Sequence, residues 1–133
     1  MARRKRILLA QYTGGADVIE HFDILANDLG YEVVVGLPTK VAEGQIKGPF
    51  DLIVQMGLGR EEKRLEGLRH VARIRELYPK PPFLVVSGHD PSYAREQVIE
   101  RGANEFLQRH TDTECSVFVQ HVQKLLISKT APS

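Results

Sequence analysis

Three residues of the types found in hydrolase triads lie close together in the sequence. Ser87, His89 and Asp90 could supply a nucleophile, a general base and an orienting carboxylate. They share one short segment between an expected strand and an expected helix, however, so their side chains are not aimed at one another. The G-x-S-x-G pattern that exposes a nucleophilic serine does not surround Ser87. Asp90, directly before Pro91, is better explained as a helix cap, and we predict no catalytic residues.

A second set of residues has the chemistry of an anion site. Gly14 and Gly15 lie in a turn before an expected helix, where backbone N–H groups attract negative charge. The hydroxyl of Ser87 and the guanidinium of Arg109 are expected at the same rim of the sheet. Together these groups could bind a phosphate or a carboxylate, although no G-x-G-x-x-G or phosphate-loop pattern is present. A tight turn and an arginine that binds carbonyl groups are the simpler alternative.

The composition disfavours metal, nucleic-acid and membrane chemistry. Cys115 is the single cysteine, and the five histidines are scattered without the spacing of a metal site. The net charge of +1 provides no overall field for nucleic acid, and the basic run at residues 3–6 is typical of a solvated tail. No apolar run is long enough for a signal peptide or a membrane span. We predict a cytoplasmic protein that has no cofactor or bound metal and contacts neither nucleic acid nor a membrane directly.

The elements that must position these residues follow from apolar runs that alternate with helical periodicity. Short apolar strands are expected at residues 7–10, 32–35, 51–56, 83–86 and 104–107. The run at 51–56 has apolar residues at almost every position, which indicates a strand buried on both faces. Amphipathic helices are expected at residues 16–29, 39–46, 65–78, 91–101 and 114–127. Thr39 is a candidate cap for the second helix, and Gly30 and Gly102 are expected to end the first and fourth.

This alternation predicts the fold class. Strands that alternate with helices through short connections form a parallel sheet covered by helices on both faces. We therefore expect an α/β fold of three layers, α/β/α, with five strands and five helices. Residues 6–127 form the expected domain, residues 1–5 a basic tail, and residues 128–133 a polar tail or the start of a linker.

Residues 6 to 127 resemble the receiver domain of two-component response regulators. Three segments carry the likeness: Gly67-Leu68 through Ile74-Arg75, then Phe83-Leu84-Val85-Val86-Ser87-Gly88, then Gly102-Ala103-Asn104-Glu105-Phe106-Leu107. No single segment is specific, but their order and spacing together are typical of receivers. The resemblance implies a flavodoxin-like, doubly wound sheet with strand order 2-1-3-4-5.

The resemblance also implies that the phosphorylation chemistry has been lost. Receivers take a phosphoryl group on an aspartate at the end of the third strand, and that position is Met56. The acidic pair that holds magnesium falls on Gln11 and Tyr12, and the lysine falls on Arg109. A thioether has no oxygen to offer, and magnesium prefers oxygen anions. Two receiver positions are retained: Ser87 matches the switch hydroxyl, and Phe106 matches the switch aromatic, although both residue types are also common in a core.

Two functions of different classes are consistent with this pattern. The first is an atypical receiver, or pseudo-receiver: a non-enzymatic signalling module that works through protein contacts without phosphorylation. The second is a sensor whose emptied pocket binds an anionic metabolite through Gly14, Gly15, Ser87 and Arg109. In receivers, partners or a second copy bind the surface made by the fourth helix, fifth strand and fifth helix, here about residues 92–127. The expected contact residues on that surface are Tyr93, Glu96, Glu100, Gln108 and Gln120.

Overall fold

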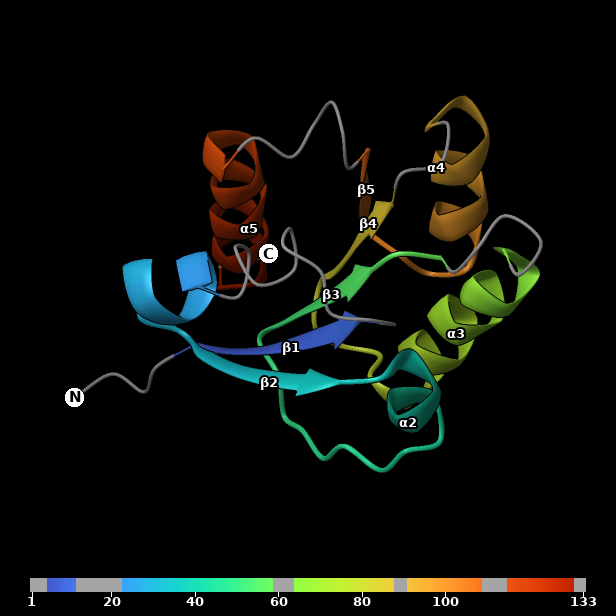
Figure 1. Ribbon diagram of the computed structural model, residues 1–133, viewed down its shortest axis with the longest axis horizontal. Coiled ribbons are helices and arrows are strands. Elements are labelled where there is room, and N and C mark those ends of the chain that lie inside the picture. The colour runs from blue at the N-terminus through green and yellow to red at the C-terminus, as the bar shows by residue number, and fades with distance from the viewer. Residues whose placement is uncertain (1–4, 12–22, 59–63, 88–90, 109–114, 131–133) are drawn as a thin grey trace.

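The computed structural model describes residues 5–11, 23–58, 64–87, 91–108 and 115–130, and its centre is a parallel sheet of five strands. Figure 1 shows the strands in the spatial order β2-β1-β3-β4-β5, which confirms the predicted fold class and strand order. Each strand falls within one residue of its expected position at both ends. The strands are β1 (Arg6–Gln11), β2 (Glu32–Gly36), β3 (Leu52–Met56), β4 (Phe83–Ser87) and β5 (Glu105–Gln108).

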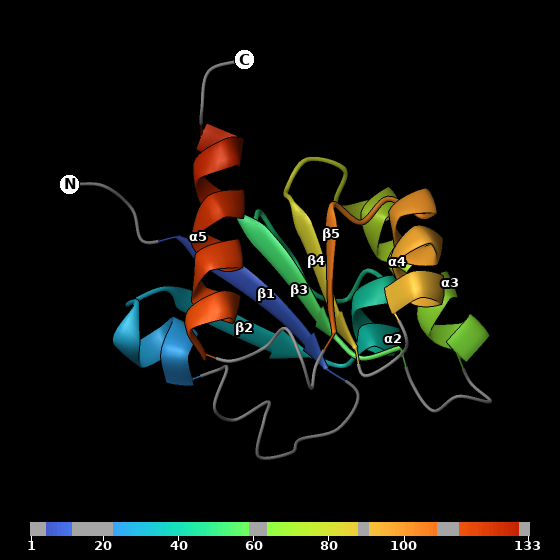
Figure 2. The ribbon, with the colours of Figure 1, turned by 90° about the horizontal axis from the view of Figure 1, so that it is seen from above.

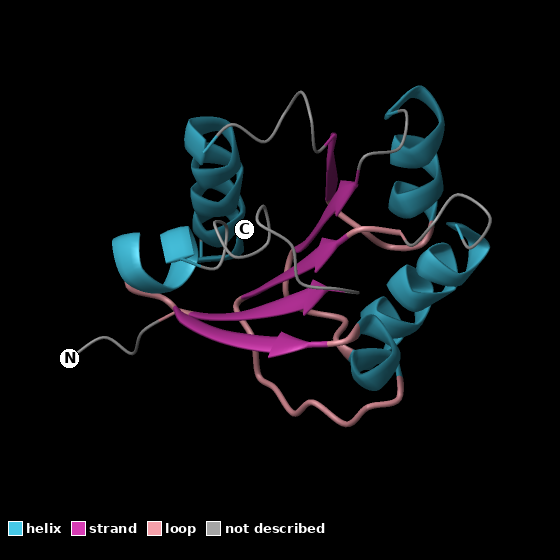
Figure 3. Cartoon of the chain, in the orientation of Figure 1, coloured by secondary structure: helices cyan, strands magenta, loops and turns pink. Residues whose placement is uncertain are grey.

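Helices cover both faces of the sheet and complete three layers. One face carries α2 (Pro38–Ala42), α3 (Arg64–Leu77) and α4 (Pro91–Glu100), and the other carries η1 (Ile24–Asp28) and α5 (Cys115–Thr130). Figure 2 shows the two helical layers edge-on, and Figure 3 separates the magenta sheet from the cyan helices. Among the helices in the described ranges, none is both long and apolar enough to cross a bilayer.

Alternation along the strands divides the core into two clusters. Leu8, Ile53 and Val85 point to the face of α2, α3 and α4, whereas Leu9, Val54 and Val86 point to the face of α5. Every residue of β3 and β4 is buried, as the unbroken apolar runs predict. The helices meet these clusters with the faces that their periodicity predicts, through Val71 and Ile74 of α3 and through Phe118, Val122, Leu125 and Leu126 of α5.

Several details of the helices differ from the sequence prediction. α2 ends at Ala42 instead of residue 46, and α5 continues to Thr130 instead of ending at residue 127. Thr39 does not cap α2: the helix begins at Pro38, Leu37 takes the N-cap position without a side-chain bond, and Thr39 lies inside. Proline is favoured at a first helical position because its φ is already helical and its missing N–H is not needed there. The described end of the first helix is a π-helix, in which the N–H of Leu29 bonds to the carbonyl of Ile24 at 2.9 Å. Gly30, at φ 71°, ends it as predicted.

Candidate functional site

The carboxyl ends of β1, β3 and β4 meet at one edge of the sheet. We call this edge the carboxyl rim and define it by Gln11, Gln55, Met56, Gly57 and Ser87. In the strand register Gln11 lies beside Met56, and Met56 lies beside Val86. Functional crevices of open α/β sheets form at such an edge, so the fold brings the predicted positions Gln11, Met56 and Ser87 to the expected place.

Met56 is part of the core at this rim. Its exposed fraction is 2%, and its side chain belongs to the cluster on the α5 face that includes Leu9, Val54 and Phe118. A methionine thioether is apolar and a weak hydrogen-bond acceptor. The end of β3 therefore presents a packed apolar group where a nucleophile or a metal ligand would have to be polar and accessible.

Two amide oxygens at the rim lack the hydrogen bonds that buried oxygens usually make. Within the described part of the chain, neither Oε1 of Gln11 nor Oε1 of Gln55 has a partner, and both atoms are buried. A buried acceptor without a donor costs about 1–3 kcal/mol. Both orphan atoms are acceptors, so they favour a hydrogen-bond donor in this place and do not attract an anion.

Gln55 also fastens the connection between β3 and α3, a role that was not predicted from the sequence. Its side chain is fully buried, and Nε2 donates to the carbonyls of Gly57 at 3.0 Å and of Gly67 at 3.4 Å. Gly67 lies directly against the Leu58 backbone, where any Cβ atom would collide. Gln55 therefore links Gly57, which directly follows β3, to Gly67 in α3. A glutamine inside an otherwise apolar strand was the available signal.

The two residues predicted to match receiver switch positions, Ser87 and Phe106, are buried on the α4 side of the sheet. Ser87 is 1% exposed and pairs in register with Gln108. Phe106 is 3% exposed and packs in the cluster that contains Ala94 and Val98 of α4. The guanidinium carbon of Arg95 lies 5.8 Å from the centre of the Phe106 ring, within the range of a cation–π contact.

Several predicted site residues lie outside the described residues. They are Tyr12, Gly14, Gly15 and Arg109, together with His89 and Asp90 of the triad-like segment. The anion site therefore stays a prediction, as does the cap at Asp90.

The folds of several solved receiver domains match this chain. No protein-family model and no curated protein matches it. A CheY-like receiver domain protein from Methanospirillum hungatei superposes with a TM-score of 0.75 at 17% identity, over 96% of this chain and 97% of that one. A two-component response regulator from Clostridium difficile gives 0.74 at 12% identity, over 97% and 100%.

The receiver domain of a sensor histidine kinase from Pseudomonas aeruginosa gives a TM-score of 0.71 at 16% identity, over 93% of this chain and 98% of that one. This chain has the receiver fold. The likeness at these identities is one of fold, and it confirms the architecture that the sequence resemblance implied.

The described residues of the carboxyl rim do not fit a magnesium ion. The Pseudomonas receiver was solved with magnesium coordinated in its active-site cleft. Magnesium is a hard cation that is bound through carboxylate oxygens and water. In this receiver fold the described side chains at the ends of β1 and β3 are two neutral amides and one buried thioether, with no carboxylate among them. Among the described residues, no three metal-binding side chains of the His, Cys, Asp or Glu type gather anywhere.

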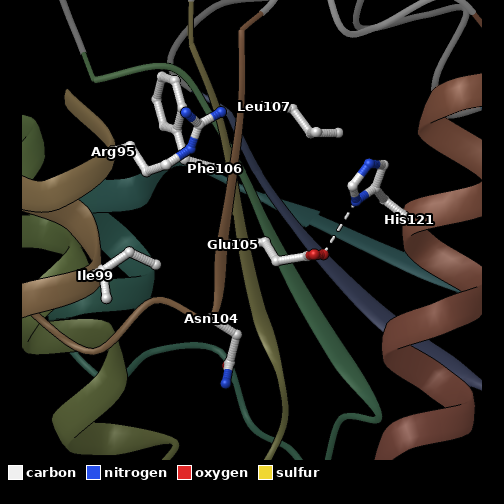
Figure 4. Close-up of a pocket in the computed structure, with 7 residues that line it drawn as sticks. All are labelled: Arg95, Ile99, Asn104, Glu105, Phe106, Leu107 and His121. Carbon is white, nitrogen blue, oxygen red and sulfur yellow. Dashed lines mark hydrogen bonds and ion pairs between the residues drawn. The ribbon is translucent and has the colours of Figure 1, made fainter. Parts of the chain in front are cut away.

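A groove opens at the other functional surface expected of the fold, between α4 and α5. Figure 4 looks onto β5, with α4 on the left and α5 on the right. The groove has a volume of about 400 Å³, and its lining residues are Arg95, Ile99, Asn104, Glu105, Phe106, Leu107 and His121. Within it, the Glu105 carboxylate lies 3.2 Å from Nδ1 of His121 and 3.1 Å from Nζ of Lys124.

Proposed function

We propose that this protein is a receiver-like signalling module of a two-component-type pathway, which acts by binding proteins and does not take up a phosphoryl group. The observation that carries the proposal is the buried thioether of Met56 at the end of β3. Phosphoryl transfer to a protein needs an oxygen nucleophile and charge neutralisation by a metal ion. The receiver fold is present, whereas the described residues at its chemical rim are apolar or neutral.

The packing at the rim supports a constitutive mode of action. Gln55 binds both ends of the connection between β3 and α3, and Phe106 lies inside the core beneath α4. In a phosphorylated receiver the phosphoryl group would shift the balance between the conformations of these elements. Here side-chain packing and the Gln55 hydrogen bonds supply fixed contacts, so we propose that the partner surface keeps one arrangement. The same features give no reason to assign an enzymatic activity.

The test of this function is chemical phosphorylation. The protein is incubated with magnesium and acetyl phosphate, or with magnesium and beryllofluoride, and followed by intact mass and amide NMR. We expect no added phosphoryl mass and no amide shifts at Gly57 or Ser87, while a phosphorylatable receiver domain run in parallel responds to both reagents. An added phosphoryl group, or beryllofluoride shifts centred on those two residues, would overturn the proposal.

A matched variant strengthens that test. Met56→Asp restores a carboxylate at the end of β3 but leaves Gln11 and Tyr12 in place of the acidic pair. We expect this variant to remain unphosphorylated because magnesium still lacks its carboxylate ligands. Phosphorylation of Met56→Asp would show that the rim can still assemble a metal site.

The proposed partner surface comprises α4, β5 and α5. Glu96, Glu100 and Gln120 are exposed there, and Gln108 is half-buried, so the surface is polar enough to remain solvated without a partner. Tyr93 is the single aromatic residue among the expected contacts, and aromatic side chains commonly anchor such interfaces. We expect Tyr93→Ala to weaken self-association or partner binding, measured by sedimentation and pull-down, more than charge reversal at Arg60 or Arg64. The reverse ranking would place the partner surface at the connection between β3 and α3.

A further inference from the structure

We propose that the groove between α4 and α5 binds an extended, acidic segment of a partner protein, which adds to the open edge of β5 as a sixth strand. This inference rests on the proposed function, because it names the partner chemistry of the same surface. It specifies an aliphatic residue and an acidic residue two positions apart in the bound segment.

The first observation is the open backbone edge of β5. β5 is an outer strand of the sheet and pairs on one side with β4. The N–H of Gly57 donates to the carbonyl of Val86, so this carbonyl faces β3 and the carbonyl of Val85 faces β5. In the register of β4 with β5, Val86 lies beside Leu107, so the backbone groups of Leu107 face β4. Because alternate residues of a strand direct their N–H and C=O groups to opposite sides, those of Phe106 face away from β4. Phe106 lines the groove, so a segment lying in it can reach the backbone groups that β4 leaves free.

The second observation is the wall formed by α4. Arg95 is exposed above the Phe106 ring, and within the described residues it has no acidic partner. Ile99, one helical turn further on, is 42% exposed and is among the most exposed large apolar side chains in the described part of the chain. A guanidinium without a carboxylate and a solvent-exposed aliphatic group therefore lie side by side along the groove.

The spacing of these two groups matches a strand. Residues four apart on a helix are about 5–6 Å apart. Residues two apart on a strand, which share one face, are about 6.6 Å apart. A strand lying along β5 can therefore place an aliphatic side chain on Ile99 and a carboxylate on Arg95 at the same time.

The third observation is the wall formed by α5, which does not repel an acidic segment. Glu105 is the acidic residue of the groove lining, and its carboxylate contacts both Lys124 and His121. The charge of Lys124 offsets that of Glu105, so Arg95 determines the sign of the net charge along the groove. Positive charge beside an open strand edge selects an acidic extended chain.

A second copy of this chain fits the same groove poorly. β5 has four residues and runs between α4 and α5, as Figure 4 shows. A second copy presents the same short strand with the same Arg95 beside it, so it does not supply the acidic chain that the groove selects. A helix cannot satisfy the open N–H and C=O groups, since its own are already paired within it. A single extended segment is the occupant that meets both requirements.

The experiment titrates the full chain with the probe peptide acetyl-Thr-Val-Thr-Glu-Thr-amide, followed by amide NMR and hydrogen exchange. Two peptides serve as controls: one with Lys in place of Glu, and one with alternate N-methylated residues that cannot form a ladder. We expect shifts at Arg95 and Ile99, slower exchange of the Phe106 amide, and clearly weaker binding of both control peptides.

Protein variants complete the test. Arg95→Glu should weaken binding by about tenfold, since it replaces attraction with repulsion. Arg69→Glu makes the same charge change at an exposed position on α3 and should leave binding unchanged. Failure of the probe to bind, equal binding of the Lys peptide, or binding without protection of the Phe106 amide would each overturn the inference. None of these outcomes alters the phosphorylation result, so failure of the inference is distinguishable from failure of the proposed function.

Discussion

The two ends of the sheet satisfy their polar groups very differently. At the carboxyl rim two buried amide oxygens lack partners in the described structure, and the central position is an apolar thioether. At the opposite end, which we call the amino rim and define by Arg6, Asp51, Arg75, Tyr78 and Asn104, polar side chains are extensively hydrogen-bonded.

Arg75 is the centre of the amino rim. Its guanidinium donates to the carbonyls of Gly102 at 2.8 Å, Tyr78 at 3.0 Å and Pro81 at 2.7 Å, and to Oδ1 of Asn104 at 2.8 Å. These bonds join the end of α3 to the segments that precede β4 and β5. Burial lowers the pKa of this guanidinium, although an arginine remains protonated at neutral pH.

The opposite side of the amino rim is held in the same way by Arg6. Its N–H donates to Oδ2 of Asp51 at 2.8 Å, and its Nε lies 2.6 Å from Glu32. Arg6 therefore belongs to the sheet, at the start of the domain expected over residues 6–127. The comparison indicates that the amino rim provides stability, while the described side chains of the carboxyl rim are neutral or apolar.

The largest effect is expected from a charge placed in the carboxyl rim. Met56→Asp should destabilise the fold by about 4 kcal/mol at pH 7, because an ionised carboxylate would replace a buried apolar group without a partner. The buried carboxyl should have a raised pKa, so the loss should be smallest in acid and grow as the pH rises. Urea denaturation at several pH values measures this, with Met56→Leu as the volume-matched control. A negligible loss would mean that the rim is open to water, and the contrast between the rims would fail.

The next largest effect is expected at the amino rim. Arg75→Ala should cost about 3 kcal/mol in the free energy of unfolding, since it removes the side-chain donor to three backbone carbonyls and one of the two donors to Oδ1 of Asn104. Arg73→Ala is the matched control, because Arg73 is exposed and donates to one carbonyl, that of Ala42. Its loss should stay below about 1 kcal/mol. Similar losses for the two variants in urea denaturation would contradict the role given to Arg75.

The difference between the rims also explains what the sequence could predict. The buried faces of α3 and α5 and the burial of β3 follow from local periodicity, which the sequence states directly. The contacts of Arg75 depend on carbonyls at Gly102 and Pro81, which are distant in sequence and meet through tertiary structure. The Gln55 bond to Gly67 could not be predicted for the same reason, since it spans twelve residues of loop and helix.

The candidate site was predictable in position and less so in detail. The apolar run before Met56 correctly placed this residue at the end of a buried strand. The orphan oxygens of Gln11 and Gln55 could not be foreseen, because side-chain partners depend on the neighbouring elements. The groove beside β5 was likewise missed as a cavity, although its surface was expected to bind partners.

A smaller difference in stability is expected between two isosteric substitutions, one at each rim. Asn104→Leu removes the acceptor of the Phe83 N–H at 2.8 Å and of Arg75, and should cost about 2 kcal/mol. Gln55→Met removes two hydrogen bonds together with one unpartnered oxygen, so its loss should stay below about 1 kcal/mol. Thermal and urea denaturation of both variants measure the difference. A larger loss for Gln55→Met would show that the carboxyl rim is the more tightly held of the two.

The smallest effect concerns the pH dependence of the amino rim. The Tyr78 hydroxyl donates to the carbonyl of Ile46, and its ring packs edge-on to Phe50 at 5.7 Å between centres. Tyr78→Phe keeps the ring and should cost about 1 kcal/mol at neutral pH. Burial raises the pKa of Tyr78, so the folded state holds this proton more tightly than the unfolded chain.

Wild-type stability should therefore fall as the pH rises above the ordinary tyrosine value of about 10, and Tyr78→Phe should lack that part of the decline. The difference in the free energy of unfolding between wild type and Tyr78→Phe should therefore become smaller as the pH rises above that value. Burial also raises the pKa of Tyr31, whose hydroxyl has no hydrogen-bond partner within the described residues. Tyr31→Phe should therefore reduce the fall of stability at alkaline pH, without a comparable loss in the free energy of unfolding at neutral pH. Denaturation curves from pH 7 to alkaline conditions test both variants. If the gap for Tyr78→Phe widened with pH, the Tyr78 hydroxyl would not be the buried donor that helps to hold the amino rim.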